Sequence, residues 1–159
     1  MLCFKFRLLN KGSNVVAADI NYERLQVLEK EANNVNLNIH FVDVTNYQSQ
    51  LALFKFARKI FNSIDLVYAN AGVNNSPDFT SDKPIEHEPD LSVLDINLKG
   101  VFYTAHLAVN SFREDANNNN NNNANDKTIV LTGSFTSFLS TPGFPSPYAA
   151  SKHGVRSLK

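Results

Sequence analysis

Short apolar runs that alternate with helical stretches constrain the fold of this chain more than any other feature. Val15–Ala18, Ile39–Val42 and Leu66–Ala69 are each of strand length, and Thr128–Leu131 is a fourth such run. The segments between them carry apolar residues at helical spacing. Strands that alternate with helices form parallel βαβ units, whose helices cover both faces of the sheet. The sequence therefore predicts an α/β fold with a parallel sheet.

The helical stretches are predicted at Tyr22–Asn33, Asn46–Asn62 and Asp90–Arg113, the last of them as one helix or two. An asparagine-rich stretch at 116–126 precedes the fourth apolar run. Because asparagine cannot bury apolar surface, this stretch predicts a disordered insertion, with an aggregation-prone tract as the alternative. It is expected to leave the sheet at the edge opposite the ligand crevice.

Polar residues stand just after each predicted strand. Asp19, Asp43, Asn70 and Ser134 occupy these positions. In open α/β sheets the ligand crevice lies beyond the carboxyl ends of the strands. We therefore expect a ligand site built from these strand ends.

Composition excludes several other functions. The formal net charge is zero and no basic cluster occurs, which argues against nucleic acid as a partner. No apolar run is long enough to span a membrane. The four histidines are scattered, which argues against a metal site, and Cys3 is the single cysteine, which favours a reducing, cytoplasmic compartment. The first nine residues do not form a signal peptide by this interpretation.

Tyr148 and Lys152 give the chain its clearest chemical pattern. Four residues apart, they lie one turn apart on the same face if the stretch is helical. A cation beside a phenol favours the phenolate, so such a tyrosine can exchange a proton with an alcohol or a ketone. The hydride that completes a carbonyl reduction must come from a cofactor. The pair therefore predicts a nicotinamide site, although chance also produces this spacing.

Further motifs accompany this pair in a familiar order. They are Asn70-Ala71-Gly72, Asn97-Leu98-Lys99-Gly100 and Thr132-Gly133-Ser134, followed by Tyr148…Lys152. Together they resemble the short-chain dehydrogenase/reductase family in its single-domain branch, from about Lys11 to Lys159. Residues 90–97 and 148–155 are also similar to members that resemble 15-hydroxyprostaglandin dehydrogenase. The resemblance implies a doubly wound, Rossmann-type parallel sheet.

The resemblance also implies catalytic roles. Tyr148 is the expected general acid and base, and Lys152 favours its phenolate and hydrogen-bonds the nicotinamide ribose. Ser134 is expected to hold the substrate oxygen, with Ser137 as the competing hydroxyl. Asn97 is expected to anchor a water that links Lys152 to solvent, or else to satisfy backbone groups at a helix kink.

Cofactor-binding residues follow from the same resemblance. Asp19 is expected to accept hydrogen bonds from the adenosine ribose and to repel a 2′-phosphate, so NAD is predicted over NADP; Arg24 is a complication unless it lies on a helix surface. Asp43 and Val44 are expected to bind adenine, with a helix N-cap as the alternative for Asp43. Asn70, Ala71 and Gly72 are expected to steady the sheet beside the ribose.

The family's glycine-rich turn, which binds pyrophosphate, is not found in the sequence. The turn and the first strand, and also the last strands, are therefore expected to be missing from 1–159, a partial NAD-binding and catalytic domain. In the strand order 3-2-1-4-5 the first strand is central, so its absence leaves strands two and four without a partner. The isolated chain is accordingly expected to be unstable or prone to aggregate.

The function predicted from these residues is that of an NAD-dependent oxidoreductase acting on a small secondary alcohol or ketone. The alternative is a catalytically inactive fragment or remnant of such an enzyme. A methyltransferase and an extended sugar epimerase fit less well, because the first does not use Tyr148 with Lys152 and the second differs at Asn70-Ala71-Gly72. Full-length relatives are expected to be homo-oligomers.

Overall fold

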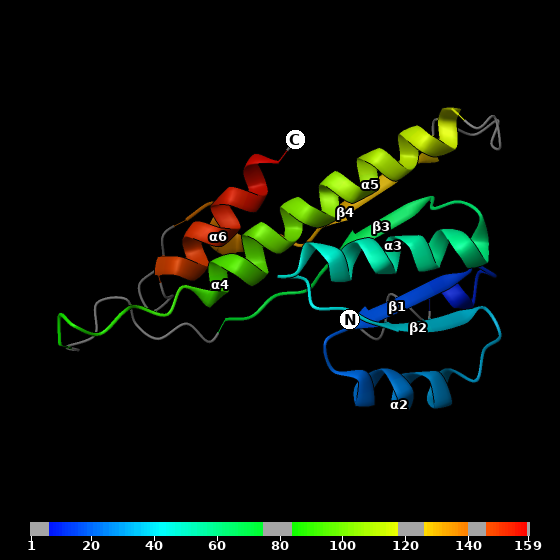
Figure 1. Cartoon of the computed structure of the whole chain (residues 1–159), viewed down its shortest axis with the longest axis horizontal. Helices are drawn as coiled ribbons and strands as arrows, with labels where there is room; N and C mark the ends of the chain where they lie inside the picture. The colour runs from blue at the N-terminus through cyan, green and yellow to red at the C-terminus, as the bar shows by residue number, and fades with distance from the viewer. Residues whose placement is uncertain (1–6, 75–83, 118–125, 140–145, 159) are drawn as a thin grey trace. The chain divides into compact units, whose positions relative to one another are not determined.

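The computed structural model of the chain describes residues 7–74, 84–117, 126–139 and 146–158. Its elements alternate strand and helix in the order the sequence predicts (Figure 1). In chain order they are β1 Val15–Asp19, α2 Tyr22–Ala32, β2 Leu37–Phe41, α3 Tyr47–Phe61, β3 Leu66–Ala69, α4 Ser92–Leu94, a π-helical turn Asp95–Lys99, α5 Gly100–Asn117, β4 Thr128–Leu131, a 3₁₀ turn Phe135–Ser137 and α6 Ser146–Ser157.

Both strand pairings are parallel, which confirms the predicted α/β class. β1 pairs with β2, with Val15 opposite Leu37, and β3 pairs with β4, with Leu66 opposite Thr128. These are the pairings of strands two with three and four with five in the order 3-2-1-4-5. Among the described residues the two pairs are separate two-stranded sheets, so the doubly wound sheet is incomplete, as predicted.

Two predicted strands differ from the observed ones. β1 ends at Asp19, one residue after the predicted Ala18. β2 begins at Leu37, two residues before the predicted Ile39, and ends at Phe41. Asn38 interrupts the apolar run in the sequence, but Leu37 is buried and takes part in the ladder with β1. Val42 follows the strand, although its N–H still donates to the Asp19 carbonyl at 3.0 Å.

The chain falls into two compact units, 1–64 and 65–159. The first unit is built on β1, β2 and α2, and Figure 1 shows α2 running beside the two strands. Its core is a cluster of buried aliphatic residues from these elements and the segment before β1: Leu9, Ala17, Leu25, Leu28 and Leu37. The Asn21 side chain caps α2 at its start, and Asn33 ends it in the left-handed conformation at φ 38°.

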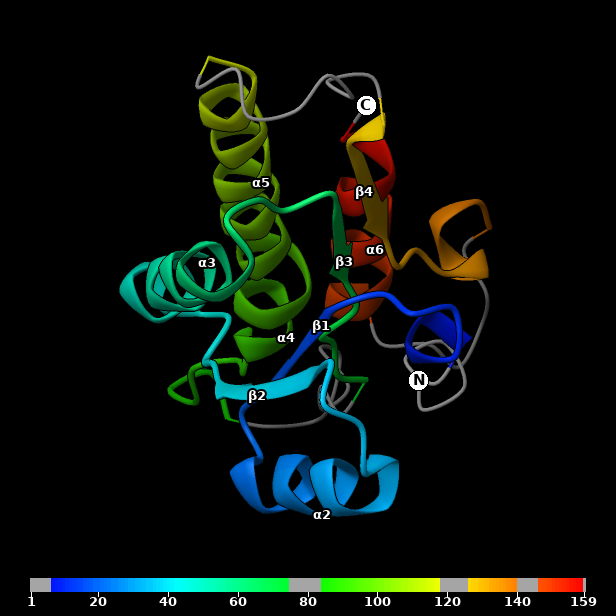
Figure 2. The same cartoon turned by 90° about the vertical axis from the view of Figure 1, so that its right-hand side faces the viewer.

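The second unit packs α5 and α6 on the β3–β4 sheet (Figure 2). Ala69 of β3, Val101 of α5 and Val155 of α6 form its buried core. Gly154 allows α6 to approach the π-helical turn, because a Cβ there would lie 2.7 Å from Leu98 Cδ1. This close approach fixes α6, and with it the predicted Tyr–Lys pair, against the π-helical turn.

The predicted helix at Asp90–Arg113 is a series of three segments. A single turn, Ser92–Leu94, leads into the π-helical turn Asp95–Lys99 and then into α5. α5 continues to Asn117, so the first two positions of the predicted insertion at 116–126 are helical. Positions 118–125 of that insertion lie outside the described residues.

Two negative findings apply to the described part of the chain. No helix there is both long enough and apolar enough to cross a membrane. The same residues include no group of three or more His, Cys, Asp or Glu side chains placed to hold a metal ion.

Candidate active site

Tyr148 and Lys152 lie one turn apart near the start of α6. The Lys152 Nζ is 6.0 Å from the centroid of the Tyr148 ring. Lys152 is 5% exposed, and its ammonium donates a hydrogen bond of 2.9 Å to the Thr132 carbonyl just after β4. Burial lowers the pKa of the Lys152 ammonium from its ordinary value. The lysine head is therefore held between α6 and the end of β4.

Gly72 lies directly against this lysine. A Cβ at position 72 would lie 3.1 Å from Asn97 Oδ1 and 3.7 Å from Lys152 Nζ. The missing side chain therefore lets the segment after β3 approach both groups. The predicted motif residues Gly72, Asn97 and Lys152 are thus brought together.

Asn97 is fully buried in the π-helical turn. Its Oδ1 accepts from the Val73 N–H at 2.8 Å, and its Nδ2 donates to the Val73 carbonyl at 2.8 Å and to Ser151 Oγ at 3.3 Å. The side chain thus pins the backbone after β3 and touches α6. This is the backbone-satisfying role weighed in the sequence analysis, while the predicted water relay stays a prediction.

Asn70 joins the ends of β3 and β4. Its Oδ1 accepts from the Thr132 hydroxyl at 2.9 Å, and the neighbouring Thr132 N–H donates to the Ala69 carbonyl at 3.0 Å. The Thr132 carbonyl in turn holds Lys152. Asn70 therefore supports the strand end from which the lysine is positioned.

The two candidate serines have different surroundings. Ser137 is 2% exposed, and its hydroxyl donates to the Ser134 carbonyl. Ser134 is half-buried, and its Oγ accepts from the Thr136 N–H at 3.2 Å and from the Thr136 hydroxyl at 2.9 Å. The Ser134 hydroxyl is thus the more exposed of the two, and its role toward a substrate stays a prediction.

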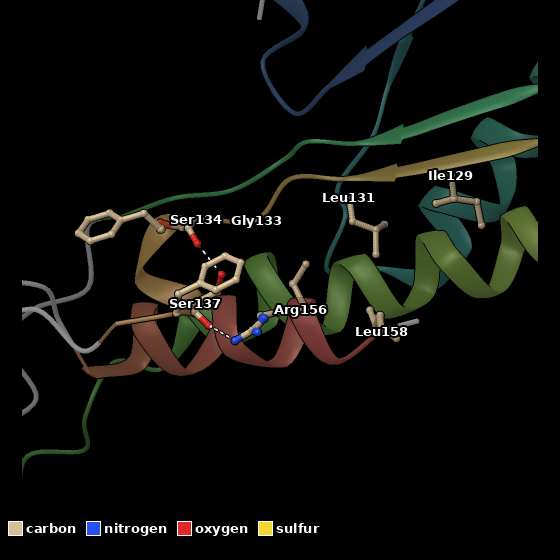
Figure 3. A pocket seen from close by; sticks show the side chains of 10 residues that line it. Ile129, Leu131, Gly133, Ser134, Ser137, Arg156 and Leu158 are labelled. Atoms are coloured by element: carbon tan, nitrogen blue, oxygen red, sulfur yellow. Dashed lines mark hydrogen bonds between the residues drawn. The ribbon is translucent and has the colours of Figure 1, made fainter.

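An open groove of about 470 Å³ borders Ser134 (Figure 3). Its walls are mostly apolar: Ile129, Leu131, Gly133, Ser134, Phe135, Ser137, Phe138, Val155, Arg156 and Leu158. Arg156 Nη1 donates to the Ser137 carbonyl at 3.1 Å, and its guanidinium stacks 4.1 Å from the Phe138 ring centroid. Tyr148 and Lys152 do not line this groove, so we do not equate the groove with the catalytic centre.

The predicted adenosine-binding residues lie in the first unit. Asp19 ends β1, and its Oδ1 accepts from the Asn21 N–H at 3.0 Å, while Arg24 is exposed on α2. Asp43 follows β2, and its Oδ1 accepts from the Thr45 N–H at 2.9 Å. The N-cap of α3 is Asn46, whose side chain accepts from the Ser49 N–H, so Asp43 does not have that role.

Sequence reasoning missed several residues that hold these groups in place. Ser151 is fully buried, and its Oγ donates to the Tyr148 carbonyl at 2.6 Å and receives Asn97 Nδ2. Gln50 of α3 is 2% exposed and donates to the Val44 carbonyl at 2.7 Å. Gln50 could have been found from the sequence, because it is a glutamine in an otherwise apolar helix stripe. No spacing pattern in the sequence indicates Ser151.

Comparison with known proteins agrees with this geometry. A parallel α/β fold with a buried lysine one turn from a tyrosine on the same helix is typical of a class of oxidoreductases, and a family model for short chain dehydrogenases matches residues 3–159. The chain belongs to the short-chain dehydrogenase/reductase family. The short-chain dehydrogenase/reductase ascJ of Acremonium egyptiacum is 34% identical over 92% of the chain. The NADP-dependent dehydrogenase M3 of a Phoma species is 31% identical over 95% of it.

A solved structure shows the same fold. The crystal structure of a short-chain type dehydrogenase/reductase from Mycobacterium marinum superposes with a TM-score of 0.78 and 23% identity, over 94% of this chain and 57% of that one. The chain spans about half the length of the curated relatives it matches, 47% of both ascJ and M3.

Proposed function

We propose that this chain carries the proton-transfer residues of an NAD-dependent oxidoreductase that acts on a small secondary alcohol or ketone. The observation that carries the proposal is the Lys152 ammonium, which is buried beside Tyr148 and fixed on the Thr132 carbonyl. A surface lysine with only a structural role would not need to be buried and fixed on a backbone carbonyl. Lys152 thus places a positive charge one turn from the phenol that, in this proposal, exchanges a proton with an alcohol.

The surrounding residues fit a nicotinamide cofactor. The close approach at Gly72, which a Cβ would crowd at Asn97 Oδ1, leaves the lysine head between two strand ends, where in this proposal a ribose hydroxyl reaches it. A bound nicotinamide supplies the hydride, which no side chain can provide. In this proposal Lys152 holds the ribose, Tyr148 exchanges the proton with the substrate oxygen, and Ser134 donates to that oxygen.

Two roles are predicted for Asn97: it satisfies backbone groups, or it anchors a water that links Lys152 to solvent. Either role would support the proposed site. The Asn97 amide holds Val73 and Ser151, and Ser151 contacts the Tyr148 carbonyl. It therefore keeps the segment after β3 and the first turn of α6 in fixed positions. A water bound nearby as a proton relay to Lys152 remains part of the proposal.

A Tyr148→Phe variant tests the catalytic role. Calorimetric titration with NAD and turnover of secondary alcohols are measured on the chain and on the variant. We expect turnover to be lost, by about a hundredfold or more, with NAD affinity nearly unchanged, since general acid–base catalysis contributes roughly 10²–10⁴. Tyr22→Phe, at an exposed position in the first unit, is the matched control. Retained turnover in Tyr148→Phe would refute the assignment.

A catalytically inactive remnant is the second candidate. The glycines are at positions 12, 72, 100, 133, 143 and 154, so no glycine-rich turn is present to bind pyrophosphate. If calorimetry detects no NAD binding to the folded chain, this candidate replaces the first for the chain as given.

Asp19 is proposed to select NAD over NADP. Its carboxylate is half-buried at the end of β1, where it would repel a 2′-phosphate. The M3 relative is named as NADP-dependent, so the selection needs a direct test. Asp19→Asn keeps the side-chain size and removes the charge, and we expect the ratio of NAD to NADP affinity to fall about tenfold, which corresponds to about 1.4 kcal/mol. An unchanged ratio would assign the selection to another residue.

A further inference from the structure

The loop after β2 is held by side chains of α3 to an unusual degree. The Asp43 N–H donates to Ser49 Oγ at 3.0 Å, and the Asp43 carbonyl accepts from the Asn46 N–H at 3.1 Å. The Thr45 N–H donates to Asp43 Oδ1, and the Val44 carbonyl accepts from Gln50 Nε2 at 2.7 Å. The peptide group between Val44 and Thr45 is therefore fixed at both its carbonyl and its N–H.

Two polar groups of this loop remain without a partner among the residues that the structure describes. They are the Val44 N–H and Asp43 Oδ2, a donor and an acceptor on adjacent residues. Both residues are half-buried, so these two groups are open to solvent or to a ligand. An adenine ring offers the complement, because its N1 accepts and its exocyclic amino group donates.

Gln50 is the residue in this arrangement that has no simple packing explanation. It is 2% exposed on a helix whose other buried residue is Phe54. Burial of an amide costs free energy unless its hydrogen bonds are made, and an aliphatic residue at this position would fill the space without that cost. The amide therefore has a role in holding the Val44 carbonyl.

We propose that Gln50 is a positioning residue for nucleotide binding: by holding the Val44 carbonyl, it keeps the loop in the conformation that presents the Val44 N–H and the Asp43 carboxylate as a donor–acceptor pair that selects adenine. The inference rests on the proposed function, since it assumes that this loop binds the nucleotide. Hypoxanthine reverses the pattern, because its N1 carries a proton and its C6 carries a carbonyl oxygen. Fixed groups should reject it, whereas a loose loop can adapt.

The test compares the chain with Gln50→Met, which keeps the length of the side chain and removes the donor. Amide hydrogen exchange is followed by NMR without ligand, and affinities for adenosine and inosine 5′-monophosphate are measured by titration. In Gln50→Met we expect about tenfold faster exchange of the Thr45 amide and a loss of about tenfold in the preference for the adenine nucleotide, the equivalent of one hydrogen bond. Phe54→Leu, at the other buried position of the same helix, should change neither selectively.

The outcomes separate the two proposals. Unchanged Thr45 exchange in Gln50→Met overturns the role of Gln50 whether or not a nucleotide binds, and so does an unchanged adenine preference. If the Thr45 amide exchanges faster in Gln50→Met but the chain binds neither nucleotide, Gln50 does hold the loop after β2. The proposed nucleotide site is then refuted. If Gln50→Met does not fold, the unmodified chain decides: a Gln50 side-chain amide proton that exchanges as fast as a solvated one overturns the proposal.

Discussion

At the scale of single residues, the buried Lys152 ammonium has the largest consequence. It is almost excluded from solvent, and its one direct protein acceptor in the described structure is the Thr132 carbonyl. A neutral carbonyl compensates a buried charge only in part. The folded protein therefore keeps a cation at a cost in stability, which is typical of a site that is preserved for chemistry.

This cost predicts a pH dependence. Because burial lowers the pKa of Lys152 in the folded state, the folded chain binds fewer protons than the unfolded chain just below the ordinary lysine value of 10.5. The free energy of unfolding of the chain, relative to that of Lys152→Met, should therefore rise with pH in that interval, by about 1.4 kcal/mol for each unit of depression. Urea unfolding of both proteins between neutral pH and 10.5 measures the difference.

The same substitution at an exposed lysine provides the control. Lys59 is exposed on α3, solvated in both the folded and the unfolded chain. Its replacement by Met should leave the stability difference constant across the same pH interval. If the difference in the free energy of unfolding between the chain and Lys152→Met is also constant with pH, burial does not disfavour the charge of the Lys152 ammonium.

At the scale of elements, the π-helical turn places Asn97 where its side chain can reach across the unit. The three hydrogen bonds of Asn97 join residues 24 and 54 positions away in the sequence. One π-helical turn in an α-helical run rotates the following residues relative to a continuous helix, and such turns are frequent at functional sites. The turn thus links the end of β3 to the start of α6.

Asn97→Leu tests this link. The variant keeps a similar volume but leaves the half-buried Val73 N–H and carbonyl without the Asn97 amide. We expect a loss of about 2–4 kcal/mol in the free energy of unfolding, since each buried group left unsatisfied costs about 1–3 kcal/mol. Asn110→Leu, at a half-buried amide on α5 that bonds to the His106 carbonyl, is the matched control and should cost less than about 1 kcal/mol. Equal losses in the free energy of unfolding of the two variants would contradict the link that Asn97 makes between the end of β3 and α6.

A second element-scale contact joins the far end of the same unit. Lys127, 9% exposed, donates to the exposed Asp65 at 2.8 Å and to the buried Asp115 at 3.2 Å. Desolvation of Lys127 works against its charge, but its hydrogen bonds to Asp65 and Asp115 prevail and raise its pKa. Lys127→Met should cost about 3 kcal/mol, because the buried Asp115 loses the cation that compensates its charge. Adding Asp115→Leu should recover much of that loss, and urea unfolding of both variants checks the pair.

At the scale of the whole molecule, the described residues of each compact unit pack around a core cluster of their own. Leu25 belongs to the core of the first unit, and Val101 to that of the second. Leu25→Ala should therefore cost about 2–5 kcal/mol in the first unit while amide exchange in α5 stays as it was. A uniform increase in exchange across both units would show instead that the chain unfolds as one cooperative body.

The sequence predicted most of the elements but not the contacts that hold the site. Periodicity located the parallel strands and α2, α3 and α5, because burial imposes it on every element. It did not locate Gln50 or Ser151, whose roles come from hydrogen bonds to backbone carbonyls rather than from periodic burial. The roles of Ser134, Tyr148, Lys152, Asn97, Asp19 and Asp43 remain predictions, since a position near a strand end does not establish chemistry.

The contact between Asp115 and Lys127 also bears on how the chain can vary in length. These residues stand 12 positions apart, on either side of the asparagine run, and their side chains meet at 3.2 Å. The two ends of the intervening segment are thus fixed whatever lies between them. By loop-closure entropy, doubling the length of such a segment costs only about 0.6 kcal/mol. Expansion or contraction of the asparagine tract should therefore be nearly neutral for the stability of the second unit.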